Sequence, residues 1–240
     1  MSDAFVLVHG GFQTASCWER LIPHLALPAL AVDLPGRGKH PAPMSEVTLE
    51  ACVRSVIADI DTAGLEGIVL VGHSLGGATV PIVASRIPER ISHLVLLSTL
   101  VAPDGGSVAD GFLPETREDA IRRLGTDGDP TVEMTTATHR ALLEDGMSEA
   151  DVDWVLGQVC ADSRHLFTDK GSRAQLPANL PRTYIRLKRD QSVSWAQQEH
   201  AISLMPGLRT REIDCAHFAM VTHPNELAEI LNEIARGVTS

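Results

Sequence analysis

The chain has 240 residues, of which 44% are hydrophobic, and it carries a formal net charge of −11 at pH 7 with a pI near 5.3. A chain of this length and composition can bury one sizeable core, so we expect a single domain. The negative charge argues against nucleic acid or an anionic membrane surface as the main partner, because both would repel it. A small neutral or cationic molecule is a better match.

The N-terminus and the cysteines predict a cytoplasmic protein. Residues 1–4 lack a basic region followed by a long apolar stretch, and no apolar run approaches the length that spans a bilayer. Cys17, Cys52, Cys160 and Cys215 are widely separated, which is typical of buried free thiols and not of metal knuckles or redox pairs. We expect no metal and no cofactor, and the sequence leaves open whether the chain forms a homodimer.

Short apolar runs alternate with helical patterns along the chain, which predicts a mostly parallel sheet flanked by helices. The six predicted strands cover residues 5–8, 30–33, 68–71, 94–97, 183–187 and 209–213. Apolar residues recur at helical spacing after Thr48, which we expect to be the N-cap, and again from Leu227 to Ile234. The second of these helices begins at Pro224 and is closed by Gly237. Both are expected to pack on the sheet.

The first strand ends in the turn His9-Gly10-Gly11-Phe12. Such a turn can place backbone NH groups at the edge of the sheet, where they could stabilise negative charge on a carbonyl oxygen during acyl transfer. The residues after this turn match neither of the glycine-rich nucleotide loops, G-x-G-x-x-G and G-x-x-x-x-G-K-S/T, so a nucleotide site is not expected. We predict that the NH of Gly11 is one donor of an oxyanion hole and that His9 is structural.

The third strand runs directly into Gly72-His73-Ser74-Leu75-Gly76-Gly77, and the helix-compatible stretch 78–85 follows. A G-x-S-x-G sequence between a strand and a helix is the nucleophile elbow, in which the serine has a strained backbone and stands exposed at the edge of the sheet. This pattern predicts Ser74 as a nucleophile. The NH of Leu75, the residue that follows it, is predicted as the second oxyanion donor.

The alternation of strands and helices stops between residues 101 and 180, where no strand run appears. We expect a helical cap here, inserted after the fourth strand, with residues 1–100 and 181–240 forming the core. Ser148 begins a predicted helix that continues to Val159. The segment accounts for −8 of the net charge. Candidate pocket residues, each of which could equally be ordinary packing, are Phe12, Trp18, Phe112, Leu113, Met134, Trp154, Leu166, Phe167 and Phe218.

A serine hydroxyl needs a histidine to take its proton and a carboxylate to orient that histidine, in the chain order serine, acid, histidine. His217 follows the last predicted strand, and Asp190 follows the one before it, so both should reach the same edge of the sheet as the serine. Asp104, after the fourth strand, is the second candidate for the acid. Asp214 lies too near His217 in sequence, and His223 fits a capping or surface role.

Taken together, these motifs resemble the small α/β-hydrolases that include plant methyl esterases, hydroxynitrile lyases and bacterial esterases. The resemblance covers nearly the whole chain and rests on residues 5–11, Cys17-Trp18, residues 33–38, the serine motif, Asp190 and residues 216–220. It implies the α/β-hydrolase fold with a serine nucleophile. Dehalogenases and epoxide hydrolases of this fold use an aspartate instead.

Two departures from the family's motifs bear on activity. The plant esterases usually have a second His-Gly pair where this chain has Gln13-Thr14, so the pocket near Trp18 is expected to differ. Gly10 and Phe218 stand where hydroxynitrile lyases have a threonine and a lysine, which argues against lyase activity. The resemblance favours hydrolysis of a small carboxylic ester. A lactone, a thioester or a C–C bond, and a ligand-binding pseudo-hydrolase, remain as alternatives.

Overall fold

The computed structural model describes residues 2–125, 128–143 and 146–237, and its main feature is a six-stranded parallel sheet. The strand order is β2-β1-β3-β4-β7-β8. The strands are β1 (Ala4–Val8), β2 (Ala29–Val32), β3 (Ile68–His73), β4 (Ile91–Leu97), β7 (Arg182–Leu187) and β8 (Arg209–Ile213). All six predicted strands are confirmed. The inner strands β1, β3 and β4 are short buried runs rich in Val, Ile and Leu, which are a strong signal for a parallel sheet, whereas the edge strands β2 and β8 are less buried.

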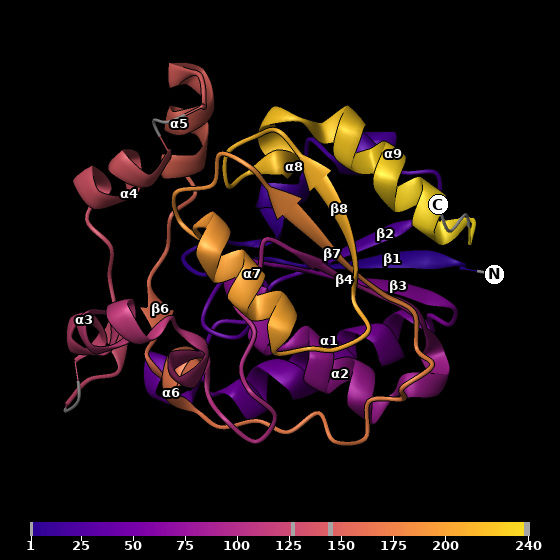
Figure 1. Cartoon of the computed structure of the whole chain (residues 1–240), viewed down its shortest axis with the longest axis horizontal. Coiled ribbons are helices and arrows are strands. Elements are labelled where there is room, and N and C mark those ends of the chain that lie inside the picture. The colour runs from indigo at the N-terminus through magenta and orange to yellow at the C-terminus, as the bar shows by residue number, and fades with distance from the viewer. Residues whose placement is uncertain (1, 126–127, 144–145, 238–240) are drawn as a thin grey trace.

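Helices cover both faces of this sheet (Figure 1). Successive side chains of a strand point to opposite faces, so Val6 and Val8 pack in one core cluster while Phe5 and Leu7 pack in the other. The first face carries α1 (Leu49–Ala63), α2 (Val80–Arg86) and α7 (Trp195–Ser203). The second face carries η1 (Ala15–Trp18), α8 (Ala219–Thr222) and α9 (Pro224–Ala235). Short 3₁₀ turns connect these elements at η2 (Ile22–His24), η3 (Met44–Glu46) and η5 (Pro88–Arg90).

Local sequence signals predict the starts of two helices correctly, and the helix predicted after the serine motif is also present. Thr48 caps α1, since its side chain accepts a hydrogen bond from the Ala51 amide. Ser148 caps α5 (Glu149–Leu156) in the same way. The helix predicted over 78–85 is α2, and a 3₁₀ turn, η4 (Ser74–Ala78), precedes it. This turn is tightly packed, because a Cβ added to Gly76 would lie 2.8 Å from the His9 carbonyl oxygen.

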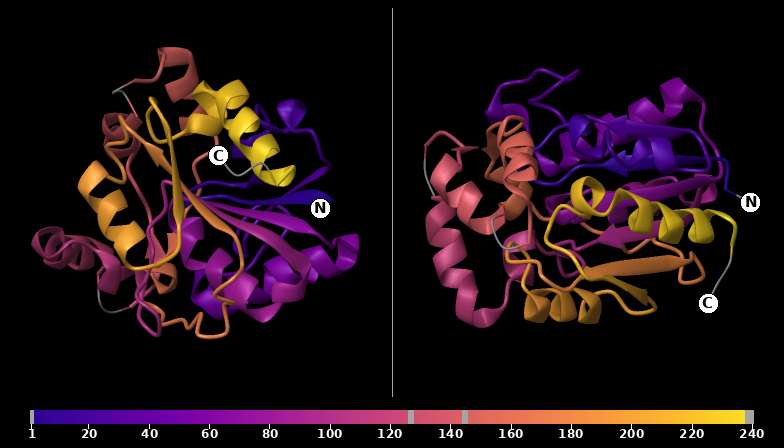
Figure 2. Two further views of the ribbon diagram at one scale, coloured as in Figure 1. Left: turned by 45° about the vertical axis from the view of Figure 1, so that its right-hand side comes forward. Right: turned by 90° about the horizontal axis from the view of Figure 1, so that it is seen from above.

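The segment between β4 and β7 lies over the carboxyl end of the sheet, and the two chain ends lie on the opposite side (Figure 2). Its elements are η6 (Val108–Gly111), α3 (Pro114–Leu124), β5 (Thr131–Val132), α4 (Thr136–Leu143), α5, β6 (Asp162–Ser163) and α6 (His165–Thr168). We call this segment the cap. The sequence indicated no strand here, yet β5 and β6 form an antiparallel pair. Strands of two residues are too short to produce a recognisable alternation.

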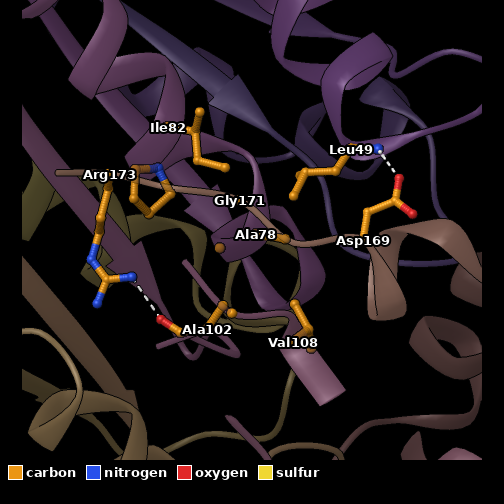
Figure 3. A pocket seen from close by; sticks show the side chains of 11 residues that line it. Leu49, Ala78, Ile82, Ala102, Val108, Asp169, Gly171 and Arg173 are labelled. Carbon is orange, nitrogen blue, oxygen red and sulfur yellow. Dashed lines mark hydrogen bonds between the residues drawn. The ribbon is translucent and has the colours of Figure 1, made fainter. Parts of the chain in front are cut away.

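The chain leaving the cap crosses the face that carries α1 and α2 through a tightly packed junction (Figure 3). Asp169 accepts a hydrogen bond from the Leu49 amide at 3.1 Å, and Arg173 donates to the Ala102 carbonyl at 2.6 Å. A Cβ on Gly171 would lie 2.4 Å from Ile82 Cδ1, so any larger residue would require the Ile82 side chain to shift. The hollow that remains is about 10 Å³, which is too small for a ligand. Within the described residues, no helix is long and apolar enough to cross a membrane.

Candidate active site

The site lies at the carboxyl ends of the strands, where the strand order reverses between β1 and β3. Ligands of open α/β sheets bind at such a switch point. Ser74 follows β3 with φ +50°, a left-handed conformation that is unusual for a residue with a side chain. The turn after β1 approaches it closely, because a Cβ on Gly10 would lie 2.8 Å from Ser74 Cβ. The serine is therefore presented on a strained turn beside the first glycine-rich loop.

Asp190 and His217 meet at the same edge of the sheet. Nδ1 of His217 donates a hydrogen bond to Oδ2 of Asp190 over 2.6 Å, and both side chains are buried. His217 and Ser74 line one cavity. This pairing leaves Nε2 of His217 as the ring nitrogen that can accept a proton from a serine hydroxyl.

Asp190 is held by four donors in addition to its burial. Its Oδ2 also accepts from the Ser98 hydroxyl at 2.6 Å, and its Oδ1 accepts from the amides of Ser192 at 2.8 Å and Val193 at 2.9 Å. Burial by itself would raise the pKa of Asp190, but the charge of His217 and these hydrogen bonds outweigh it and lower the pKa below its usual value. The carboxylate therefore stays ionised at neutral pH.

Ser98 was not identified from the sequence, although it directly follows β4 at the same edge of the sheet. Its φ of +41° and complete burial mark it as a constrained position. The sequence offered one signal for Ser98. It follows β4, which lies between β3, the strand before Ser74, and β7, the strand before Asp190. A hydroxyl there can reach the acid, and nothing in the local sequence distinguishes it from an ordinary turn serine.

The amides of Gly11 and Leu75 are the two predicted oxyanion donors, and both residues line the cavity. Neither amide donates a hydrogen bond to another residue in the described part of the chain. The next amide, that of Phe12, is already used, since it donates to Oδ2 of Asp162 in the cap at 2.9 Å. Phe12 has φ +61°, so the chain turns sharply at Phe12, directly after this amide.

Two further buried histidines support the site without facing the reaction. Nε2 of His73 donates to the backbone carbonyl of His217 at 2.9 Å, and the two rings lie 4.4 Å apart. Nδ1 of His9 donates to the Gly10 carbonyl, and its Nε2 accepts from the Leu34 amide. Burial, followed by the charge of Arg37, lowers the pKa of His9 to about 4. His9 is therefore neutral and bonds to the backbone through both nitrogens.

The cavity above Ser74 has a volume of about 490 Å³, which is within the range of small-molecule sites. Its floor is formed by the loops after β1, β3 and β8, and its roof by α3, α4 and the strand β5. Five of the nine candidate pocket residues lie in its wall: Phe12, Phe112, Met134, Phe167 and Phe218. Cap residues that the sequence did not indicate also contribute, including His139 and Leu142 of α4.

The other four candidates lie outside this cavity. Trp18 and Leu166 are buried in the two core clusters, and Trp154 packs under the guanidinium of Arg20 at 4.8 Å. The Leu113 amide bonds to Gln197, which fixes the start of α3. Aromatic or apolar character alone does not tell a pocket residue from a core residue.

The alternative acids and the alternative histidine also lie elsewhere. Asp104 occupies an exposed turn, where it accepts from the Arg173 amide at 2.7 Å. Asp214 pairs with Arg189 at 3.1 Å on the surface. His223 bonds to the neighbouring Thr222 hydroxyl. None of these three residues lines the cavity that contains Ser74.

Charge is scarce in the cavity although the cap is acidic. Arg123 and Glu133 are the only lysine, arginine or carboxylate residues among the described lining residues. The acidic side chains of the cap instead form ion pairs on its outer surface, for example Asp119 with Arg122, and Glu149 and Asp153 with Arg140. The pocket is thus suited to an apolar, uncharged molecule. Over the described residues, no group of three or more His, Cys, Asp or Glu side chains is arranged to hold a metal ion.

Comparison with known proteins identifies the class. The chain belongs to the alpha/beta hydrolase family, whose model matches residues 5–230. This finding confirms the resemblance that the motifs predicted and the fold that it implied.

Relatives of similar length extend the comparison. Esterase PIR7B of Oryza sativa subsp. japonica is 28% identical over 255 residues, which cover 96% of this chain and 95% of the rice protein. Methylesterase 9 of Arabidopsis thaliana is 27% identical over 250 residues, covering 96% and 97%. Among solved structures, an extracellular alpha/beta-hydrolase from a Paenibacillus species has a TM-score of 0.84 at 23% identity, covering 95% and 97%. Polyneuridine aldehyde esterase has a TM-score of 0.81 at 23% identity, covering 98% and 100%. These two structural likenesses concern the fold.

Proposed function

We propose that the chain is a carboxylic ester hydrolase that uses Ser74 as nucleophile, His217 as general base and Asp190 to orient His217. The observation that carries this proposal is the 2.6 Å hydrogen bond between buried Asp190 and His217 in the cavity lined by Ser74. Ester hydrolysis is also supported by the relatives named esterase and methylesterase.

In the first half of the reaction, Oγ of Ser74 attacks the ester carbonyl carbon while Nε2 of His217 takes its proton. Negative charge develops on the carbonyl oxygen and is stabilised by the amides of Gly11 and Leu75. Removing one such donor typically costs about 2.7–4 kcal/mol of transition-state stabilisation. Collapse of the intermediate breaks the bond to the alcohol, which receives the proton from His217 and leaves an acyl group on Ser74.

In the second half, a water molecule attacks the acyl-enzyme and His217 takes a proton from it. The same two amides bind the oxygen as it becomes negative again. The serine then leaves with the proton returned by His217, and a carboxylic acid is released. Asp190 remains ionised throughout and keeps the Nδ1 proton of His217 in place, in agreement with the lowered pKa of this carboxyl.

The cavity favours an uncharged ester with an apolar body. Its wall is built largely from Phe, Leu, Met and Val side chains, and the volume of about 490 Å³ admits a molecule of moderate size. The separate candidate, a pseudo-hydrolase that binds ligands without turnover, predicts a serine of ordinary reactivity.

The test is hydrolysis of p-nitrophenyl butanoate by the wild type, Ser74→Ala and His217→Ala. We expect both variants to lose activity by about 10³-fold or more, as observed when members of such a triad are removed. Ser45→Ala, at an exposed serine in η3, is the matched control and should retain full activity. Equal rates for the wild type and Ser74→Ala would show that the serine mechanism is wrong.

A further inference from the structure

A buried ion pair joins the cap to the turn after β2. Nη2 of Arg37 donates to Oδ1 of Asp162 at 2.7 Å, Nη1 donates to Oδ2 at 3.3 Å, and both side chains are almost completely buried. Arg37 comes from the turn after β2, 125 residues away from Asp162 in β6. A two-point contact of this kind fixes the relative orientation of the two groups.

Asp162 also holds the backbone next to the proposed oxyanion donor. Its Oδ2 accepts from the Phe12 amide at 2.9 Å, and the neighbouring Cys160 amide donates to the Phe12 carbonyl at 3.0 Å. The backbone NH and the backbone carbonyl of Phe12 are therefore both bound to the cap. Since Phe12 has φ +61°, which is unfavourable for a residue with a side chain, these bonds maintain a turn that the local sequence would not keep by itself.

The carboxylate of Asp162 would harm catalysis if it were not neutralised. A Cβ built on Gly11 would lie 3.3 Å from Oδ2 of Asp162, so this oxygen lies beside the residue whose amide is to bind the oxyanion. A bare negative charge at that place, shielded from water, would oppose the developing negative charge of the transition state. Arg37 supplies the compensating positive charge.

We propose that Asp162 and Arg37 are positioning residues for the oxyanion hole: Asp162 holds the Phe12 peptide so that the Gly11 amide faces the substrate, and Arg37 cancels its charge. This inference rests on the proposed function. It also gives a role to the motif Asp33-Leu34-Pro35-Gly36-Arg37-Gly38. The turn is narrow at Gly38, whose φ is +50° and where a Cβ would lie 2.1 Å from Asp33 Oδ2.

The test compares Arg37→Gln with Asp162→Asn. Arg37→Gln leaves a bare carboxylate, so kcat should fall about tenfold or more, a part of the 10²–10³-fold loss seen when a whole donor is removed. The Ki of an aryl trifluoromethyl ketone, whose adduct with the serine carries a negative oxygen in the hole, should rise by the same factor, while KM changes less than about threefold. Asp162→Asn keeps an acceptor for the Phe12 amide and should retain the Ki within about threefold. The double variant should recover most of the kcat lost in Arg37→Gln.

A merely structural role predicts a different pattern, in which kcat falls only as far as the thermal midpoint falls and both single variants weaken the ketone equally. That pattern would overturn the inference. If Arg37→Gln does not fold, Asp162→Leu takes its place in the test, because leucine cannot accept a hydrogen bond from the Phe12 amide. Equal Ki values for Asp162→Asn and Asp162→Leu would then contradict the inference. Arg140→Gln, which removes ion pairs on the outer face of the cap, is the control. Fluorophosphonate labelling of the wild type is run in parallel, since its absence would refute the proposed function and not this inference alone.

A separate observation concerns His139 of α4, which lies in the cavity wall and is only 6% exposed. Its ring meets the Phe12 ring edge-on, with centroids 5.6 Å apart. Nδ1 of His139 is completely buried and has no hydrogen-bond partner within the described chain, which leaves Nε2 as the ring nitrogen that a ligand in the cavity can reach. Burial, followed by the charge of His217, lowers the pKa of His139, so the ring is neutral and can both donate and accept.

We further infer that His139 binds an uncharged hydroxyl or carbonyl group on the substrate, close to the scissile ester. A polar group in an apolar cavity is unfavourable unless it is hydrogen-bonded, and a ligand that forms a hydrogen bond with Nε2 of His139 gains affinity from it. Val132, Met134 and Leu142 give the neighbouring wall an apolar part, and Glu133, Thr135 and Thr138 are other polar cap residues in the lining. The substrate class is therefore an apolar ester with one such group near the carbonyl.

Isosteric substrates test this directly. Ethyl 3-hydroxybutanoate is compared with ethyl 3-methylbutanoate, and ethyl 2-hydroxypropanoate with ethyl 2-methylpropanoate. For each pair, the kcat/KM of the hydroxyl ester is divided by that of the methyl ester. In at least one pair, this ratio should be about threefold or more lower for His139→Phe than for the wild type. His139→Gln, which can still form a hydrogen bond, should retain most of the ratio. Unchanged ratios in His139→Phe for both pairs would overturn the inference, whereas no hydrolysis of any ester, p-nitrophenyl butanoate included, would refute the proposed function instead.

Discussion

Oδ2 of Asp190 accepts hydrogen bonds from two side chains at once, Nδ1 of His217 and Oγ of Ser98, each at 2.6 Å. The three residues follow β7, β8 and β4, which are neighbours in the sheet. The acid is thus positioned by strands on both sides of its own. Because the carboxylate has no freedom to rotate away, the imidazole that it orients is held in one direction.

Ser98→Ala should reduce kcat by about three- to tenfold. The variant removes one charge-assisted hydrogen bond to Asp190, a loss of about 1.5–3 kcal/mol in binding to a charged group, of which only part affects the alignment of His217. KM should change little, since Ser98 does not line the cavity. Ser92→Ala on the same strand is the control, because its hydroxyl bonds only at the far end of β4. A kcat equal to that of the wild type would refute this role for Ser98.

Gly10→Ala should abolish most of the activity while the chain still folds. The added methyl group would lie 2.8 Å from Ser74 Cβ and 3.1 Å from His73 Nδ1, so the serine turn must shift. Misplacement of a reacting group by about 1 Å can cost about 10²-fold in rate. Gly157→Ala in the cap is the matched control, because the atom nearest to the new Cβ would lie 3.4 Å away, an ordinary contact distance. Full esterase activity in Gly10→Ala would contradict the close approach.

Acid should weaken the fold through Asp190. Its pKa in the folded chain is lowered, so its interactions stabilise the protein fully above the unfolded value of about 3.9, and this stabilisation is lost as the pH falls through the folded pKa. Urea unfolding between pH 3 and pH 7 should show this loss in the wild type. Asp190→Asn should be less stable at pH 7 and should lose less stability in the acid range. If the free energy of unfolding fell equally with pH in the wild type and in Asp190→Asn, the lowered pKa assigned to Asp190 would be contradicted.

Protonation of buried His93 should cause a second loss of stability, at a higher pH than the protonation of Asp190. Burial, followed by the charge of Arg209, lowers the pKa of His93 to about 4, and its ring bonds to the Thr183 hydroxyl at 2.9 Å. Since the unfolded chain takes up this proton near pH 6.5 and the folded chain does so only near pH 4, stability falls between these values by up to about 3 kcal/mol. His93→Gln should show a smaller fall in urea midpoint from pH 7 to pH 4.5. An unchanged fall would show that His93 is not responsible.

Strands β1, β3 and β4 were predictable because each is largely an apolar run, whereas β8 has the more polar sequence Arg-Thr-Arg-Glu-Ile and a weaker signal. Asp190 and His217 could be chosen because the carboxyl ends of parallel strands meet at one edge, so their place after a strand was enough. The cap offers no such rule. His139 lies on a helix whose orientation over the cavity depends on packing, and the contact between Asp162 and Arg37 joins segments 125 residues apart.

The reactivity of Ser74 towards a fluorophosphonate, mapped by mass spectrometry of the labelled peptide, tests the central claim most directly. We predict one label per chain, located on Ser74, absent in Ser74→Ala and greatly slowed in His217→Ala, because only a serine activated by a base reacts readily with this reagent. The absence of a label in the wild type, or a label on any residue other than Ser74, would contradict the account.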